Sequence, residues 1–169
     1  CVNRRGFDQE LGREVARSTR ANTEFSLLAL DLDFFKNVND TRGHLVGDAV
    51  LREIGALLKQ SRRAGDIVAR TGGEEFSIIL PDTAPAGAHL VATRLCDAVR
   101  SHEFLAGAKP VHLTVSIGLV AKSADLHDDV MDEIKKRADD ALYHAKRSGR
   151  DCVRIWTWAL VARRSGGRI

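Results

Sequence analysis

The segment Phe25–Leu32 is almost entirely apolar, and two aspartates, Asp31 and Asp33, stand where it ends. An apolar run of this length predicts a strand that is buried on both faces. A chain of 169 residues is long enough to bury such a strand within one domain. The acidic end of the strand is therefore the first place to expect chemistry.

Hydrophobic periodicity predicts the elements around this strand. Helices are expected from the N-terminal region to about Asn22, from about Val46 to the basic segment Lys59–Arg63, after Pro85, and over Ile134–Ala145 with Gly149 closing it. Further strands are expected at Asp66–Arg70, Phe76–Leu80, Val111–Leu119 and Val153–Trp156. Gly72 and Gly73 lie between the first two of these, where we expect them to supply the positive φ angles of a hairpin turn. This order favours an α+β fold, a mostly antiparallel sheet flanked by helices.

Composition excludes several classes of protein. The chain is 44% hydrophobic and 29% charged, which is typical of a globular domain and not of a disordered one. No segment approaches the roughly 20 apolar residues that span a bilayer, and a net charge of +3 gives no reason to expect a nucleic-acid partner. Three scattered cysteines without a CxxC pair suggest neither disulfides nor a zinc site, so a cytoplasmic location is expected.

Two acidic pairs are candidates for metal binding. Asp31 and Asp33 follow the buried strand, and Glu74 and Glu75 follow the glycine pair. Magnesium is usually held by one or two carboxylates together with substrate phosphates, so the pairs predict a metal site only if they meet in space. Taken singly, acidic residues at strand ends are more often solvated turn residues.

Four motifs occur in order along the chain: Asn3-Arg4-Arg5-Gly6-Phe7, the segment from Asp31 through Lys36 and Asn39 to His44, Gly47 and Asp48, the turn Arg70-Thr71-Gly72-Gly73-Glu74-Glu75-Phe76, and Ala141-Leu142-Tyr143 followed by Lys146, Gly149 and Arg150. Together they resemble the GGDEF family of diguanylate cyclases. A single GGEEF would carry little weight, but four ordered motifs make a chance match implausible. The resemblance implies a ferredoxin-like fold similar to the catalytic core of class III nucleotide cyclases.

The resemblance also implies an activity, the condensation of two GTP molecules into cyclic di-GMP with release of two pyrophosphates. Two divalent ions per active site, Mg²⁺ or Mn²⁺, would be held by Asp31, the Leu32 carbonyl, Glu74 and Glu75. Glu74 is the candidate to activate the attacking 3′-hydroxyl, either through a metal or as a direct base, and Glu75 and Lys36 would assist catalysis. No firm role follows for Asp33.

Substrate contacts follow from the same resemblance. The triphosphate would be bound by Lys36, the backbone N–H groups around Phe34 and Phe35, Lys146 and Arg150, although the last two taken alone fit an ordinary basic helix end. Asn39 and Asp48 would bind the guanine edge, His44 would line the pocket, and Gly72 and Gly73 would let the backbone approach the nucleotide.

A second site is suggested by Arg63 and Asp66, which have the RxxD spacing and the register to the glycine pair of the family's product-inhibition site. Arg94 matches a secondary arginine of that site. Cyclic di-GMP would bind there and inhibit the enzyme.

The chain departs from the family pattern at Thr71, where tyrosine is usual, and at Asp151, where asparagine usually follows the closing Gly-Arg. The family's opening is only partly present, so we expect residues 1–156 to be an N-terminally truncated catalytic domain that lacks an upstream sensor. It would be the cytoplasmic part of a larger protein, either soluble or membrane-anchored. Residues 157–169 are expected to be a flexible tail.

The resemblance implies a homodimer, in which each copy brings one GTP. The alternatives are a non-catalytic module that binds nucleotide or product, against which the intact acidic and basic residues argue, and a mononucleotide cyclase of similar fold.

Overall fold

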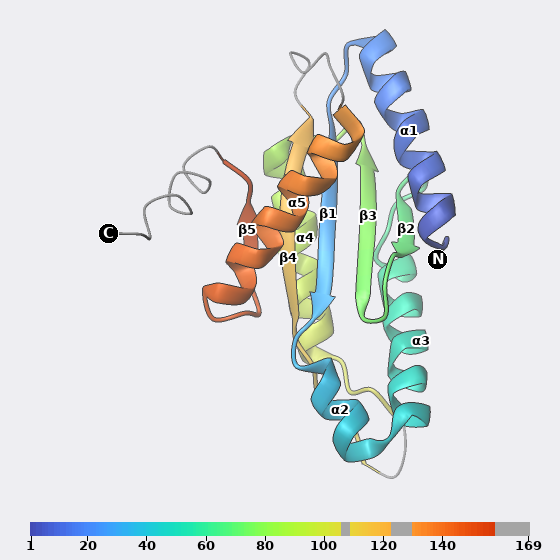
Figure 1. The fold of residues 1–169 in the computed structure, drawn as a ribbon, viewed down its shortest axis with the longest axis vertical. Coiled ribbons are helices and arrows are strands. Elements are labelled where there is room, and N and C mark those ends of the chain that lie inside the picture. Colours follow the sequence, from blue (N-terminus) through green and yellow to red (C-terminus); the bar gives the residue numbers. More distant parts are fainter. Residues whose placement is uncertain (106–108, 123–129, 158–169) are drawn as a thin grey trace.

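The computed structural model describes residues 1–105, 109–122 and 130–157 of the chain. One five-stranded sheet, with strand order β2-β3-β1-β4-β5, forms its centre, and helices lie on both faces (Figure 1). Neighbouring strands are antiparallel except β4 and β5, which are parallel. The predicted α+β, mostly antiparallel architecture is confirmed.

The elements, in chain order, are α1 (Arg4–Ala21), β1 (Phe25–Leu32), α2 (Phe35–Arg42), α3 (His44–Gln60), β2 (Ile67–Arg70), β3 (Glu75–Pro81), α4 (Pro85–Ser101), β4 (Val115–Lys122), α5 (Val130–Arg147) and β5 (Val153–Ile155). All eight residues of β1 are buried, as its apolar composition predicts. Its odd and even positions pack into different cores, because successive side chains of a strand point to opposite faces.

The two cores hold the helices against the sheet. Leu28, Leu30 and Leu32 belong to the larger cluster, which includes side chains of α3 and α4. Leu27 and Ala29 belong to the smaller cluster with α1 and α5. The strand therefore lies at the centre of a three-layer molecule, and its C-terminal end is surrounded by elements from both faces.

Gly118 in β4 allows α5 to pack closely on the sheet. A Cβ atom at this position would lie 2.2 Å from the Ala138 carbonyl oxygen and 2.3 Å from the Leu142 nitrogen, both backbone atoms of α5. Backbone cannot yield as a flexible side chain can, so only glycine permits this approach. The approach brings the C-terminal turn of α5 to the end of β1.

Three details differ from the sequence-based expectation. A separate helix, α2, occupies Phe35–Arg42, where the sequence periodicity predicted no helix. Strand β4 begins at Val115, so Val111 lies outside it and forms an isolated bridge with Phe104. The glycines with left-handed φ angles are Gly43, Gly65 and Gly149, not Gly72 or Gly73, so the hairpin is not built on positive φ at the glycine pair.

Within the described ranges, no helix combines the length and apolar character needed to cross a bilayer. Of the predicted tail, residues 158–169 lie outside the part of the chain that the structure describes.

Candidate active site

The two acidic pairs predicted from the sequence meet at one end of the sheet. Strands β1 and β3 are antiparallel neighbours, and their register pairs Asp31 with Glu75. The Leu32 backbone N–H also donates to the Glu74 carbonyl oxygen at 3.3 Å. The carboxylates of Asp31, Glu74 and Glu75 are therefore held together by the hydrogen bonding of the sheet itself.

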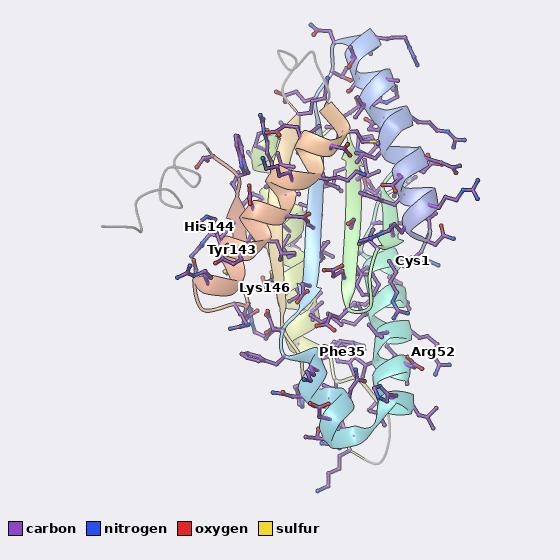
Figure 2. The ribbon with its side chains drawn as sticks, in the orientation of Figure 1. Cys1, Phe35, Arg52, Tyr143, His144 and Lys146 are labelled. Carbon is purple, nitrogen blue, oxygen red and sulfur yellow. The ribbon has the colours of Figure 1, made fainter. Side chains whose placement is uncertain are left out.

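Lys146 adds a positive charge to this acidic end. Its Nζ lies 2.6 Å from Asp31 Oδ2, although the two residues are at opposite ends of the sequence. Asp31 is only 6% exposed. Figure 2 shows Lys146 on the last turns of α5, near the end of β1 from which Phe35 and α2 continue. A buried carboxylate requires such a partner, because an isolated buried charge is costly.

The local environment disfavours ionisation of Asp31 and Glu74. Burial raises the pKa of Asp31, and Glu75 and Asp33 raise it further, while the hydrogen bond and charge of Lys146 oppose the shift. Burial also raises the pKa of Glu74, with the Asp31 charge as the next cause. Desolvation and like charge act in the same direction here. The cluster thus has an excess of negative charge that one lysine offsets only in part.

Among the described residues, no group of three or more His, Cys, Asp or Glu side chains is arranged to hold a metal ion. The donors nevertheless have the right chemistry, since carboxylate and carbonyl oxygens are the ligands of Mg²⁺ and substrate phosphates usually complete its shell. The raised pKa values of Asp31 and Glu74 point the same way, because a cation would relieve the repulsion that raises them.

The hairpin turn between β2 and β3 presents Glu74 and Glu75. Both Thr71 and Gly72 donate their backbone N–H to the Glu75 carbonyl oxygen, at 3.0 and 3.2 Å. The Arg70 guanidinium braces the turn from outside by donating to the Gly73 carbonyl oxygen at 2.7 and 3.1 Å. A Cβ on Gly72 would lie 2.2 Å from Glu75 Oε2, so this glycine makes room for the glutamate side chain.

Asp33 has a structural position that the sequence did not reveal. It is 3% exposed and accepts hydrogen bonds from the hydroxyls of Thr114 and Ser116, each at 2.7 Å, and from the Asp151 backbone N–H at 3.0 Å. Its carboxylate is thus fully engaged with protein donors. Asp33 ties the end of β1 to β4 and to the loop that follows α5.

The residues expected to bind nucleotide lie on α2, on α3 and at the end of β1. Phe34 has φ 57° and immediately precedes α2, which begins soon after β1 ends. Lys36, His44 and Asp48 are exposed, Asn39 is partly exposed, and Phe35 is buried in the core. The left-handed Gly43, with φ 84°, separates the two helices, so Asn39 and Asp48 come from different helices.

Gly47 is a residue whose role the sequence analysis missed, although it stood within a quoted motif. A Cβ there would lie 1.9 Å from Asn39 Oδ1 and 3.2 Å from Phe35 Cζ. The side chain of Asn39 therefore lies directly against the Gly47 backbone. The only sequence signal was a glycine inside an amphipathic helix, which often has a packing reason.

Arg150, expected to contact phosphate, lies over the exposed ring of Phe34, with Cζ 4.4 Å from the ring centroid. This cation–π contact links the loop after α5 to the start of α2. Phe34, Lys146 and Arg150 thus surround the same end of β1 as the acidic cluster.

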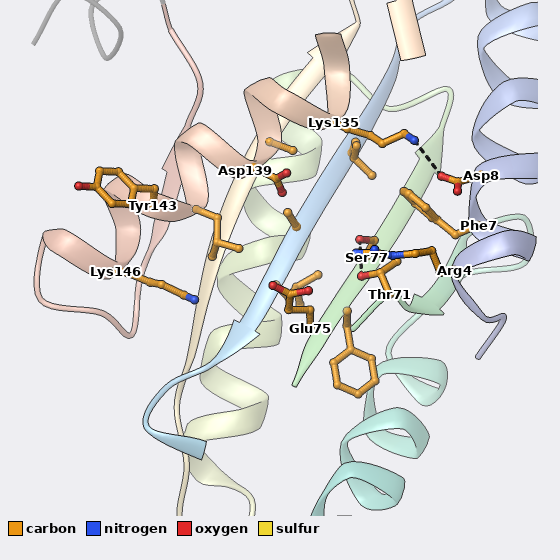
Figure 3. A pocket seen from close by; sticks show the side chains of 16 residues that line it. Arg4, Phe7, Asp8, Thr71, Glu75, Ser77, Lys135, Asp139, Tyr143 and Lys146 are labelled. Carbon is orange, nitrogen blue, oxygen red and sulfur yellow. Dashed lines mark hydrogen bonds and ion pairs between the residues drawn. The ribbon is translucent and has the colours of Figure 1, made fainter. Parts of the chain in front are cut away.

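A cavity of about 500 Å³ adjoins the acidic cluster on the face covered by α1 and α5. It shares Glu75 and Lys146 with the predicted site, but Asn39, His44 and Asp48 are not among its lining residues. Figure 3 shows Glu75 and Lys146 at one end of this cavity. Burial and the Glu75 charge raise the pKa of Asp139 on its wall. The cavity is thus distinct from the predicted guanine site.

Arg63 and Asp66 form an ion pair at the start of β2. Arg63 Nε lies 3.1 Å from Asp66 Oδ1, and the Arg63 backbone N–H donates to Asp66 Oδ2 at 3.0 Å. Asp66 is 5% exposed, whereas the Arg63 side chain is 57% exposed and also contacts Pro81 and Thr83. Arg94 is exposed on α4. Asp66 orients Arg63, and Arg63 presents its guanidinium at the surface.

Comparison with known proteins gives consistent results. The family model "Diguanylate cyclase, GGDEF domain" matches residues 1–152. Response regulator PleD of Caulobacter vibrioides is 42% identical over 153 residues, which cover 89% of this chain and 33% of that protein. Diguanylate cyclase DgcP of Pseudomonas aeruginosa is 38% identical, over 90% of this chain and 22% of its own length. The chain thus spans about a third or less of these relatives.

Two solved structures are also similar. The GGDEF domain of DgcB from Caulobacter crescentus, in complex with c-di-GMP, has a TM-score of 0.84 at 33% identity and covers 90% of this chain and 87% of its own. The active GGEEF domain of a diguanylate cyclase from Vibrio cholerae has a TM-score of 0.84 at 31% identity, with 92% and 97% covered. From the matched motifs, the sheet topology and these similarities it follows that the chain belongs to the GGDEF domain family.

Proposed function

We propose that this chain is the catalytic domain of a diguanylate cyclase, which condenses two GTP molecules into cyclic di-GMP and releases two pyrophosphates. The observation that carries the proposal is the convergence of Asp31, Glu74 and Glu75 with Lys146 at one end of the sheet. Membership of the GGDEF family and the names of its curated relatives support the same activity.

Two divalent ions, Mg²⁺ or Mn²⁺, would be bound by Asp31, the Leu32 carbonyl, Glu74 and Glu75, and would offset the negative charge of the phosphates. Lys146 would then exchange its contact with Asp31 for a contact with the triphosphate. Lys36, Arg150 and the backbone N–H groups at Phe34 and Phe35 supply further positive potential around the same end of β1.

The chemical step is attack of the 3′-hydroxyl of one GTP on the α-phosphorus of the other. An O–P bond forms, the bond to pyrophosphate breaks, and the hydroxyl proton leaves to a base. Glu74 is the residue proposed to activate that hydroxyl. It would do so either through a bound metal or as a direct base.

Guanine selectivity is assigned to Asn39 and Asp48, with His44 and the Gly72–Gly73 backbone lining the nucleotide. A carboxylate accepts from the ring N–H and exocyclic amine of guanine, and an amide supplies both a donor and an acceptor, a combination that adenine does not match. We therefore expect GTP to be used and ATP to be rejected.

A single copy of the chain offers one such nucleotide site, and the reaction consumes two nucleotides. We propose that two copies face one another in a homodimer, each with one GTP. Dimerisation then becomes a condition for catalysis.

Product inhibition is assigned to Arg63 with Asp66 and Arg94. The exposed guanidinium of Arg63 can stack on a guanine and bond its edge, while Asp66 already uses both carboxylate oxygens to orient it. Arg63→Ala should relieve inhibition by added cyclic di-GMP and leave the uninhibited rate within about twofold, as expected for a surface residue outside the active site. Arg62→Ala is a neighbouring control, since Arg62 donates to the Asp66 backbone carbonyl oxygen and not to the carboxylate that orients Arg63. Unchanged inhibition in Arg63→Ala would contradict this assignment.

The direct test of the activity is incubation of the purified chain with GTP and Mg²⁺, followed by chromatographic detection of cyclic di-GMP. We expect product from GTP and none from ATP. If a sample shown to be dimeric made no product yet bound GTP, the chain would instead be a nucleotide-binding module.

A further inference from the structure

The loop that follows α5 has an unusual backbone. Gly149, Arg150 and Asp151 have φ angles of 107°, 64° and 46°. Left-handed backbone is easy for glycine and tolerated by aspartate, but uncommon for arginine. Consecutive residues of this kind persist only where surrounding contacts hold them.

One set of contacts holds the backbone. The Asp151 N–H donates to Asp33 Oδ2 at 3.0 Å, and Asp33 is fixed in turn by Thr114 and Ser116. The Arg150 N–H donates to the Ala145 carbonyl oxygen at 3.2 Å. These bonds join the loop to the end of β1 and to the last turn of α5.

A second set holds the Asp151 side chain. Arg100 on α4 donates Nε and Nη2 to the two carboxylate oxygens of Asp151, at 2.6 and 2.9 Å. Asp97, one turn earlier on α4, braces the same guanidinium at 2.7 Å. A planar fork bonded to both oxygens fixes the orientation of the carboxylate as well as its position. Asparagine, usual in the family here, could accept only one of these bonds.

The residue between these anchors is Arg150, whose guanidinium lies 4.4 Å from the Phe34 ring centroid at the phosphate end of the site. We propose that Arg100 and Asp151 are positioning residues that hold the loop so that Arg150 is oriented toward the triphosphate. The inference rests on the proposed function, because it assumes that Arg150 contacts phosphate. It adds α4, an element outside the predicted site, to the support of substrate binding.

The exposure of the pair argues against a mainly stabilising role. The side chains of Arg100 and Asp151 are 47% and 30% exposed, and exposed ion pairs contribute little to folding. The interaction energy of such an exposed ion pair is nevertheless sufficient to favour one orientation of a loop over another. It corresponds to a factor of up to about five in an equilibrium constant.

The test is a set of steady-state measurements with GTP. Arg100→Met should raise KM about two- to fivefold with kcat changed less than about twofold, because ground-state phosphate binding is lost. Asp151→Asn should raise KM by a smaller factor, since it keeps one bond to Arg100. Arg13→Met is the matched control: it removes an exposed ion pair with Glu10 on α1, far in the sequence from the loop, and KM should not change.

A double-mutant cycle tests whether Arg100 acts on the KM for GTP through Arg150. In the Arg150→Ala background, Arg100→Met should have no further effect on KM, because the residue it positions is absent. An equal effect with and without Arg150, or no effect of Arg100→Met at all, would overturn the inference.

Equilibrium dialysis of GTP against the same four proteins separates this inference from the proposed function. If the wild-type chain makes no cyclic di-GMP but GTP binding follows the cycle, the proposed activity fails and the inference stands. If product is made and the two substitutions act additively, the inference fails and the activity stands.

Discussion

The ion pair between Asp31 and Lys146 determines the charge balance of the acidic cluster at the end of β1. The carboxylate is buried and lies beside two glutamates, and among the residues that the structure describes its ion-pair partner is Lys146, at 2.6 Å. Such a site binds further positive charge favourably, because each added cation reduces the repulsion among the carboxylates. The proposed binding of divalent metal follows from that imbalance.

Glu74→Gln should separate activity from stability. We expect turnover to fall by at least about 100-fold, the scale of a lost general base or metal ligand. Stability at pH 7 should rise. The pKa of Glu74 is raised in the folded state, so its favourable contribution is complete below the ordinary carboxyl pKa and is lost as the pH rises through the folded pKa. Glutamine does not ionise, so the Glu74→Gln variant does not lose this stability as the pH rises.

Urea denaturation at pH 7 and pH 4 measures this effect. The gain in unfolding free energy from Glu74→Gln should be present at pH 7 and shrink at pH 4, where the wild-type side chain is largely protonated. Glu24→Gln, at an exposed position just before β1, is the control and should change neither activity nor stability. A variant that kept full turnover would remove Glu74 from the mechanism.

At the scale of elements, glycine determines two contacts that the site requires. Gly118→Ala should destabilise the fold by about 3 kcal/mol or more, since its Cβ would meet backbone atoms of α5 at 2.2 and 2.3 Å and overpacking against backbone is costly. Gly12→Ala on α1 should be neutral or stabilising, because its Cβ would make only an ordinary 3.8 Å contact with Met131. Urea midpoints of both variants check this. Equal midpoints would contradict the close packing of α5 on β4.

Between α2 and α3, a glycine substitution is expected to change substrate binding. Gly47→Ala would force Asn39 away, because the new Cβ would lie 1.9 Å from Asn39 Oδ1. We expect KM for GTP to rise at least about tenfold, the scale of one lost hydrogen bond to a base edge. Gly55→Ala on the same helix places its Cβ 3.4 Å from Cys1 Sγ and should leave KM unchanged. If both variants had the same KM, Asn39 would not contact the guanine.

Sequence patterns predicted the elements with long periodic signals and missed those defined by three-dimensional contacts. Strand β1 was predicted with its observed bounds because its apolar run is continuous. Helix α2 was missed because its eight residues bury only Phe35 and Val38 and show no extended period. The anchoring role of Asp33 and the ion pair of Arg100 with Asp151 join distant parts of the sequence, so no local pattern could indicate them.

At the scale of the whole molecule, one sheet brings together residues from both ends of the chain. Lys146 and Arg150 reach the end of β1 because β4 lies beside β1 and α5 packs on both. The proposed site would hold one nucleotide per copy, and the proposed reaction needs two. The specific activity should therefore depend on protein concentration.

Initial rates measured across a wide range of enzyme concentration test this dependence. Specific activity should rise with concentration and level off as the dimer saturates, in step with the dimer fraction from sedimentation velocity. Constant specific activity across the monomer–dimer transition would contradict the two-copy arrangement.

The central claim is that the acidic end of β1 holds the metal and the triphosphate. It is tested by titrating the chain with Mn²⁺ in the presence of a GTP analogue that lacks the 3′-hydroxyl. Binding is measured as the loss of the electron paramagnetic resonance signal of free Mn²⁺. We expect the wild-type chain and an Asp132→Asn control, at a side chain that is 89% exposed near the start of α5, to bind Mn²⁺ with similar affinity, whereas Asp31→Asn should bind it at least about tenfold more weakly, the scale of one lost charged ligand. Equal affinity in Asp31→Asn and wild type would show that the end of β1 is not the metal–triphosphate site.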